Sequence, residues 1–199
     1  MQTAIYDQIF DAQQHYRLIL DSMARPGKIS VFPELELDYP AGINRASILI
    51  AMALLNTDVS FTALAEFEGA IADYIALHTS AVKAELTETD FVFVPQNFNA
   101  EFIYSLKVGN LPYPEESATI IADANAISTA PFPGAMELTL KGPGINGTTV
   151  IYIAGLNPEI LDELKIQNAE FPLGIDLMVT DADANLICIP RSTSVVISH

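Results

Sequence analysis

The first apolar pattern along the chain has the spacing of a helix. From Tyr6 to Met23, apolar residues recur every three or four positions among Gln, Asp and Arg, which predicts an amphipathic helix over this range. Pro26 ends it, because the residue before a proline is pushed out of the helical region, and Gly27 permits a turn. Asn44 is the expected N-cap of a second helix, Arg45–Asn56, whose faces are apolar nearly all round. That helix is therefore predicted to be buried on most sides.

The rest of the chain alternates short β patterns with short helical ones. Strands are predicted at Lys28–Phe32, Val59–Phe61, Phe91–Val94, Ser117–Ala122, Met136–Leu140, Thr148–Ile153, Ile175–Thr180, Leu186–Ile189 and Val195–Ile197. Helices are predicted at Glu68–His78, Asn99–Val108 and from Asn157-Pro158-Glu159 to about Asn168. Glu34, Glu36 and Asp38 alternate like the solvated face of an edge strand. The expected fold class is α/β, a mixed β-sheet with flanking helices, and no linker divides residues 1–199, so a single domain is predicted.

Composition narrows the class of protein. The chain has 25 acidic and 9 basic residues and a net charge of −16, yet only 17% of its residues are charged and 50% are hydrophobic. So many apolar residues exclude a disordered acidic tail, and the scattered cations offer no footprint for nucleic acid or for a membrane surface. The longest apolar run, Ala46–Leu55, is far shorter than the about 20 residues that span a bilayer. Without a signal-like amino terminus and with one cysteine, Cys188, a cytoplasmic protein lacking disulfides is expected.

Most residues with catalytic potential have an ordinary structural explanation. Asp11 and His15 are one helical turn apart, but two ligands on one helix do not make a metal site, so a helix pair is favoured. His78 is expected at a helix C-terminus, where a partly charged imidazole is favourable. The glycine-rich segment 142–147 lies between two predicted strands, which indicates a hairpin, whereas a phosphate loop needs a helix to follow. Cys188 is expected to be a buried, inert thiol. No metal or cofactor site is predicted.

Two segments suggest more than structure, because each places an arginine beside a proline in a turn and the chain has few arginines. Asp176 lies in an otherwise apolar strand and needs a partner if it is buried. Arg191 is the expected partner, since a guanidinium satisfies a carboxylate in a bidentate manner. Whether this pair is structural or binds a ligand stays open at this point. The ligand or interface candidates are Arg25, Pro26, Gly27, Asp176, Arg191, Ser192 and Thr193.

The same segments carry a family resemblance. Phe-Pro-Leu-Gly-Ile-Asp at 171–176 and Ile-Pro-Arg-Ser-Thr at 189–193 resemble the C-terminal signature of the PhnH family, the H subunit of the bacterial carbon–phosphorus lyase machinery for phosphonate use. Segments 10–27, 114–119 and 140–145 resemble further parts of the family in the same order. The family usually has two threonines after the arginine, where this chain has Ser192-Thr193 and so keeps the hydroxyl.

The resemblance implies a fold similar to pyridoxal-phosphate-dependent transferases without that cofactor's chemistry. It implies a homodimer alone and a hetero-oligomer with partners of the G, I, J and L types. In that pathway the G, H, I and L set, alpha-D-ribose 1-methylphosphonate 5-triphosphate synthase, exchanges the adenine of ATP for a methylphosphonate-type substrate, and the J partner later cleaves the carbon–phosphorus bond. No catalytic residues of the H subunit carry over, so an assembly or non-catalytic role is expected.

Two other functions stay open from the sequence. An independent enzyme would bind a phosphate or phosphonate through Arg25 and Arg191, against the repulsive field of the net −16 charge. A pyridoxal-phosphate enzyme needs a shielded Schiff-base lysine. The available lysines all lie in turn-like or polar stretches: Lys28, Lys83, Lys107, Lys141 and Lys165.

Overall fold

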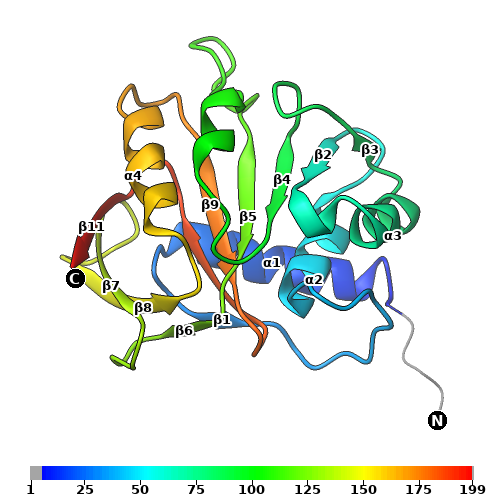
Figure 1. The fold of residues 1–199 in the computed structure, drawn as a ribbon, viewed down its shortest axis with the longest axis horizontal. Coiled ribbons are helices and arrows are strands. Elements are labelled where there is room, and N and C mark those ends of the chain that lie inside the picture. Colours follow the sequence, from blue (N-terminus) through cyan, green and yellow to red (C-terminus); the bar gives the residue numbers. More distant parts are fainter. Residues whose placement is uncertain (1–5, 199) are drawn as a thin grey trace.

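A seven-stranded mixed sheet runs through the middle of the computed structural model, which describes residues 6–198 (Figure 1). Its strand order is β1-β10-β9-β5-β4-β2-β3. Strands β9, β5, β4, β2 and β3 are parallel to one another, whereas β10 and β1 add antiparallel strands at one edge. The bounds are β1 Ser30–Val31, β2 Ser60–Ala63, β3 Val82–Lys83, β4 Phe91–Val94, β5 Thr119–Asp123, β9 Asp176–Thr180 and β10 Asn185–Ile189.

Both faces of this sheet are covered, which explains why the central strand β4, Phe91–Val94, is apolar at every position. In β4, Val92 and Val94 belong to the core on one side of the sheet and Phe93 to the core on the other. Three helices cover the Phe93 side: α1 Phe10–Ala24, α2 Arg45–Leu54 and α3 Ala70–Thr79. A short 3₁₀ helix, η1 Ala65–Phe67, precedes α3.

The opposite face carries the elements that form the candidate site. Helix α4 Pro158–Gln167, the 3₁₀ helix η2 Glu101–Ser105 and a four-stranded antiparallel sheet pack there around one core. The order of this second sheet is β11-β7-β8-β6, with β6 Ala126–Ser128, β7 Met136–Lys141, β8 Thr149–Ala154 and β11 Ser194–Ser198. Helix α4 and β11 lie together at the end of the molecule opposite α3 (Figure 1).

The expected α/β class with a mixed sheet is confirmed, and so are most of the predicted elements. The glycine-rich segment does join β7 and β8 as a hairpin. At the start of α4, the side chain of Asn157 accepts the backbone N–H of Glu159 at 3.0 Å, as a capping asparagine should. That residues 1–199 form one domain stays a prediction. Within residues 6–198, no helix is long and apolar enough to cross a membrane.

Three sequence predictions are wrong in detail. Residues 99–108 form only the short helix η2, because Leu106 already adopts an extended backbone and ends it. Residues 34–38 alternate in exposure but pair with no strand, since Pro33 follows β1 and has no N–H to donate. Asn44 occupies the N-cap position of α2 as predicted, but its side chain makes no capping hydrogen bond; its amide donates to the carbonyls of Ala124 at 3.1 Å and Thr180 at 3.2 Å.

Candidate functional site

The ion pair between Asp176 and Arg191 ties the start of β9 to the segment that follows β10. Asp176 is the first residue of β9, and Arg191 follows β10, so the antiparallel pairing of these strands returns Arg191 to the start of β9. Oδ1 of Asp176 accepts the backbone N–H of Arg191 at 2.7 Å and its Nε–H at 3.2 Å, and Oδ2 lies 2.6 Å from Nη2. The side chains are only 15% and 14% exposed. The predicted partnership is confirmed.

The remaining donors of Arg191 are also occupied by the protein. Nη1 donates to the carbonyl of Pro114 at 2.9 Å and to that of Pro172 at 3.4 Å, and Nη2 donates to the hydroxyl of Ser117. Since a guanidinium has five N–H groups, no donor is left for a ligand. In this arrangement the Arg191 side chain ties two further segments, Pro114–Ser117 and the one at Pro172, to the start of β9.

The other predicted arginine lies at the surface. Arg25 is paired with Asp21, and its side chain is 60% exposed. Lys28 pairs with the same carboxylate. Gly27 adopts φ +79°, and a Cβ there would lie 2.8 Å from Cδ1 of Leu140 and 3.0 Å from Cγ2 of Thr149. The turn therefore needs glycine both for its backbone and for its close contact with the β7–β8 hairpin.

The glycine-rich hairpin loop lies between the two predicted segments. A Cβ at Gly144 would be 2.2 Å from the carbonyl oxygen of Ala24, and one at Gly142 would be 2.9 Å from the carbonyl oxygen of Ser192. The loop thus contacts the Ala24–Gly27 turn on one side and the Ser192–Thr193 turn on the other. The sequence indicated the hairpin but gave no sign of this bridging position.

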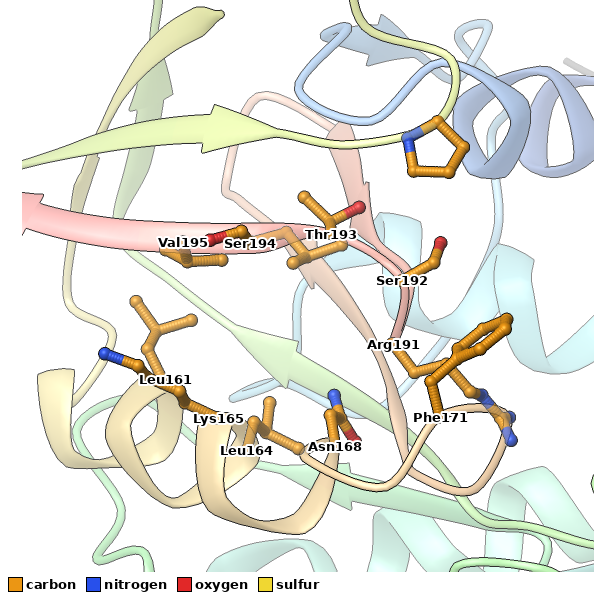
Figure 2. A pocket seen from close by; sticks show the side chains of 12 residues that line it. Leu161, Leu164, Lys165, Asn168, Phe171, Arg191, Ser192, Thr193, Ser194 and Val195 are labelled. Atoms are coloured by element: carbon orange, nitrogen blue, oxygen red, sulfur yellow. The ribbon is translucent and has the colours of Figure 1, made fainter.

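A cavity of about 470 Å³ lies beside this loop, between α4 and the start of β11 (Figure 2). Of the predicted candidates, Arg191, Ser192 and Thr193 line it, whereas the Arg25 turn and Asp176 do not. Figure 2 shows α4 side chains along one wall and the residues from Arg191 to Val195 along the other. The full lining is Pro143, Leu161, Leu164, Lys165, Asn168, Phe171, Ile189, Arg191, Ser192, Thr193, Ser194 and Val195.

The polar groups at the cavity differ in how they are satisfied. The amide of Asn168 is used internally: its Oδ1 accepts the N–H of Ile175 at 2.7 Å and its Nδ2 donates to the Ile175 carbonyl at 3.0 Å. Thr193 Oγ1 is buried and has no hydrogen-bond partner among residues 6–198. Lys165 is exposed, and no carboxylate of the described chain lies within 4 Å of its Nζ.

The histidine and cysteine candidates are structural. His15 is buried against the rings of Tyr6 and Phe32, at centroid distances of 5.6 and 5.2 Å, and burial lowers its pKa while the nearby Asp11 carboxylate opposes that shift. Cys188 is buried in β10, and burial raises the pKa of its thiol. In the part of the chain that the structure describes, no three His, Cys, Asp or Glu side chains are grouped to hold a metal ion.

Sequence reasoning missed a buried carboxylate at the carboxyl end of β5. Asp123 accepts the backbone N–H of Asn44 and the hydroxyl of Ser47, each at 2.6 Å, and the hydroxyl of Thr180 at 3.1 Å. Burial raises the pKa of Asp123 to about 6, although these three hydrogen bonds favour the ionised form. The group fastens the amino terminus of α2 to the ends of β5 and β9. An acid directly after an apolar strand was the only sign of it in the sequence.

The fold and site define an α/β protein with a largely apolar cavity beside an arginine whose donors are satisfied within the chain. Residues 3–196 match the family described as "Bacterial phosphonate metabolism protein (PhnH)". The chain belongs to the PhnH family, which confirms the resemblance.

Two relatives agree with this assignment. The chain is 31% identical over 192 residues to "Alpha-D-ribose 1-methylphosphonate 5-triphosphate synthase subunit PhnH" of Rhizobium meliloti (strain 1021), covering 96% of this chain and 92% of the relative. It is 25% identical over 183 residues to "Putative C-P lyase subunit protein HtxG" of Stutzerimonas stutzeri, covering 92% of this chain and 85% of that protein.

Proposed function

We propose that this chain is an assembly subunit, without catalytic residues of its own, of the carbon–phosphorus lyase and ribose 1-methylphosphonate 5-triphosphate synthase machinery of phosphonate catabolism. The observation that carries the proposal is the family match across residues 3–196, together with relatives named as subunits of that machinery. We expect a cytoplasmic homodimer when the chain is alone and a hetero-oligomer with G, I, J and L subunits.

The side chains of the candidate site support an assembly role. Both guanidiniums that an independent phosphate-binding enzyme would use, those of Arg25 and Arg191, are paired with carboxylates of this chain. If the Arg191 side chain moved to bind a ligand, the largely buried carboxylate of Asp176 would lose its counter-charge, and this would cost folding free energy.

The lysines give no support for pyridoxal-phosphate chemistry. Lys28, Lys83 and Lys107 are each paired with a carboxylate, and all three side chains are partly exposed. Lys141 and Lys165 are exposed. A Schiff-base lysine needs a desolvated place instead. We therefore keep the similarity to the pyridoxal-phosphate-dependent transferase fold as a proposal about architecture alone, testable by incubating the chain with the cofactor and expecting no absorption band of a bound form.

Exposed apolar side chains on α1 offer a surface for a partner. Tyr16 and Leu20 lie one helical turn apart and are 50% and 56% exposed, and Phe10 at the start of the helix is 73% exposed. Large apolar groups that gather on one surface mark interaction sites more often than isolated ones do.

Co-expression with the G, I and J subunits tests the proposal. We expect this chain to elute with them, and complexes prepared without it to be incomplete. The double variant Tyr16→Glu/Leu20→Glu should weaken co-elution, whereas Leu77→Glu, at an exposed leucine of α3, should not. Elution of this chain alone, with normal assembly of the others, would refute the assembly role. Turnover of a phosphonate by the isolated chain that Arg25→Ala or Arg191→Ala abolishes, with the fold intact, would favour the enzyme instead.

A further inference from the structure

The cavity between α4 and β11 has the dimensions and the apolar wall of a small-molecule site. Its volume of about 470 Å³ lies within the roughly 300–1,000 Å³ typical of ligand pockets. Leu161 and Leu164 of α4 form one side and Val195 belongs to the other, while Phe171 lies at the end near Arg191 (Figure 2). Ile189 also lines the cavity. An apolar group placed there would be removed from water on several sides at once.

The charges around the cavity are unusual for this chain. Acidic residues outnumber basic ones 25 to 9, yet no carboxylate among residues 6–198 lines the cavity, and both charged side chains that do are basic. The carboxylates of Glu159 and Asp162 line an adjoining hollow, which Lys165 and Leu161 also line. Figure 2 shows the ammonium of Lys165 at one end of the cavity and the guanidinium of Arg191 at the other.

Only one of these two cations is available to a ligand. The donors of Arg191 are used by Asp176, Ser117 and two carbonyls, so its charge is neutralised and its hydrogen bonds are made. Lys165 has no carboxylate within 4 Å of its Nζ among residues 6–198, and its exposed side chain, with three N–H donors, lines the cavity.

We infer that this cavity binds a small organic monoanion with an apolar body, such as a medium-chain carboxylate. The anionic head lies on the Lys165 ammonium, and the body lies between the leucines of α4 and Val195. A single negative charge fits better than a phosphate dianion, because only one cation has free donors and the chain as a whole carries −16. This site belongs to the isolated chain and does not depend on the proposed assembly role.

Octanoate is the probe, titrated below its micelle concentration into the isolated full chain at physiological salt. Methyl NMR reports the site directly: the signals of Leu161, Leu164 and Val195 should shift in a saturable way, whereas Leu77 on α3 should not move. Calorimetry should give one site per chain. Octanamide, which keeps the body but loses the charge, should bind about tenfold or more weakly, and inorganic phosphate should cause no saturable shift.

A matched pair of lysine variants tests the head-group assignment. Lys165→Gln should weaken octanoate binding about tenfold or more, because a charge-assisted hydrogen bond is lost, while leaving octanamide binding unchanged. Lys141→Gln removes another exposed charge, from β7, at a residue that does not line the cavity, and it should leave both affinities unchanged.

Several outcomes would overturn the inference. Absence of a saturable shift at the three cavity residues refutes the site, and equal binding of octanoate and octanamide refutes the anion assignment. If the cavity methyls respond only to added G, I or J subunit, the cavity is a subunit contact and not a ligand site. That last result would leave the assembly proposal standing, so the two proposals fail separately.

Discussion

Removing Asp176 should destabilise the protein far more than removing an exposed ion-pair partner. Asp176→Ala leaves the guanidinium of Arg191 buried, at 14% exposure, without its counter-charge. It also leaves the Arg191 backbone N–H without its acceptor. Breaking a buried pair by deleting one partner costs about 3–5 kcal/mol. With a urea m-value of about 2.5 kcal/mol/M, the unfolding midpoint should fall by about 1–2 M.

The matched control is the pair of Lys83 with Asp73 on the opposite side of the molecule. Their side chains are 46% and 76% exposed, so solvent screens the attraction. Lys83→Ala should therefore cost less than about 1 kcal/mol and shift the midpoint by less than about 0.4 M.

A double-mutant cycle separates the pair from its surroundings. The Asp176→Ala/Arg191→Ala variant should be less destabilised than the sum of the two single variants, because it leaves no unpaired buried charge. If Asp176→Ala does not fold, Asp176→Asn and Arg191→Lys give the same ranking with smaller changes, since lysine lacks the planar fork of arginine. The assay is urea unfolding by circular dichroism at pH 7 and 25 °C. The reasoning is wrong if Asp176→Ala shifts the midpoint no more than Lys83→Ala does.

Three further predictions concern backbone, hydroxyl and pH. Gly144→Ala should lower the free energy of unfolding, measured in urea, by more than about 2 kcal/mol, because the residue has φ +83° and a Cβ there would meet the Ala24 carbonyl at 2.2 Å. Gly147→Ala, with φ +80° and open space around it, should lower it by only about 1–2 kcal/mol, and equal losses would contradict the contact. Thr193→Val should raise stability by about 1 kcal/mol, because it removes a buried hydroxyl without a partner, and a loss of stability would mean that a partner exists. Asp123 has a folded-state pKa of about 6 against an ordinary 3.8, so the folded chain holds its proton to a higher pH than the unfolded chain does, and the stability gained from that proton is lost as pH rises through 6. Relative to Asp123→Asn, the unmodified chain should lose stability between pH 4 and 7, and parallel curves of stability against pH would refute this.

Local patterns were enough to predict much of the fold. Asn157 and Pro158 mark the start of α4 by short-range chemistry, since the cap and the missing N–H depend only on neighbouring residues. The β7–β8 hairpin follows from glycines between two β runs. The two-residue strand β3 gave no pattern, because its pairing with β2 arises only in the assembled sheet.

The candidate site was predictable in part. The pair of Asp176 and Arg191 followed from one rule, that a carboxylate in an apolar strand needs a partner. Lys165 gave no such signal, because a lysine near the end of a helix is common and favourable in itself. Its position at the cavity depends on β11 returning beside α4 after the chain has crossed the main sheet.

The sequence by itself determined the fold class, the main helices, the Asp176–Arg191 partnership and the PhnH family, because each depends on local spacing, on an uncompensated charge or on contiguous motif residues. Tertiary structure alone decided that the side chain of the N-cap residue Asn44 bonds the sheet ends and not the first turn of α2, and that Asp123 is buried there. It also decided that the glycine-rich loop contacts the two arginine turns. It further decided that, within the part of the chain that the structure describes, no carboxylate lines the cavity of so acidic a protein. These features depend on which distant segments pack together, and that choice is made by burial of the whole core rather than by any one stretch of residues.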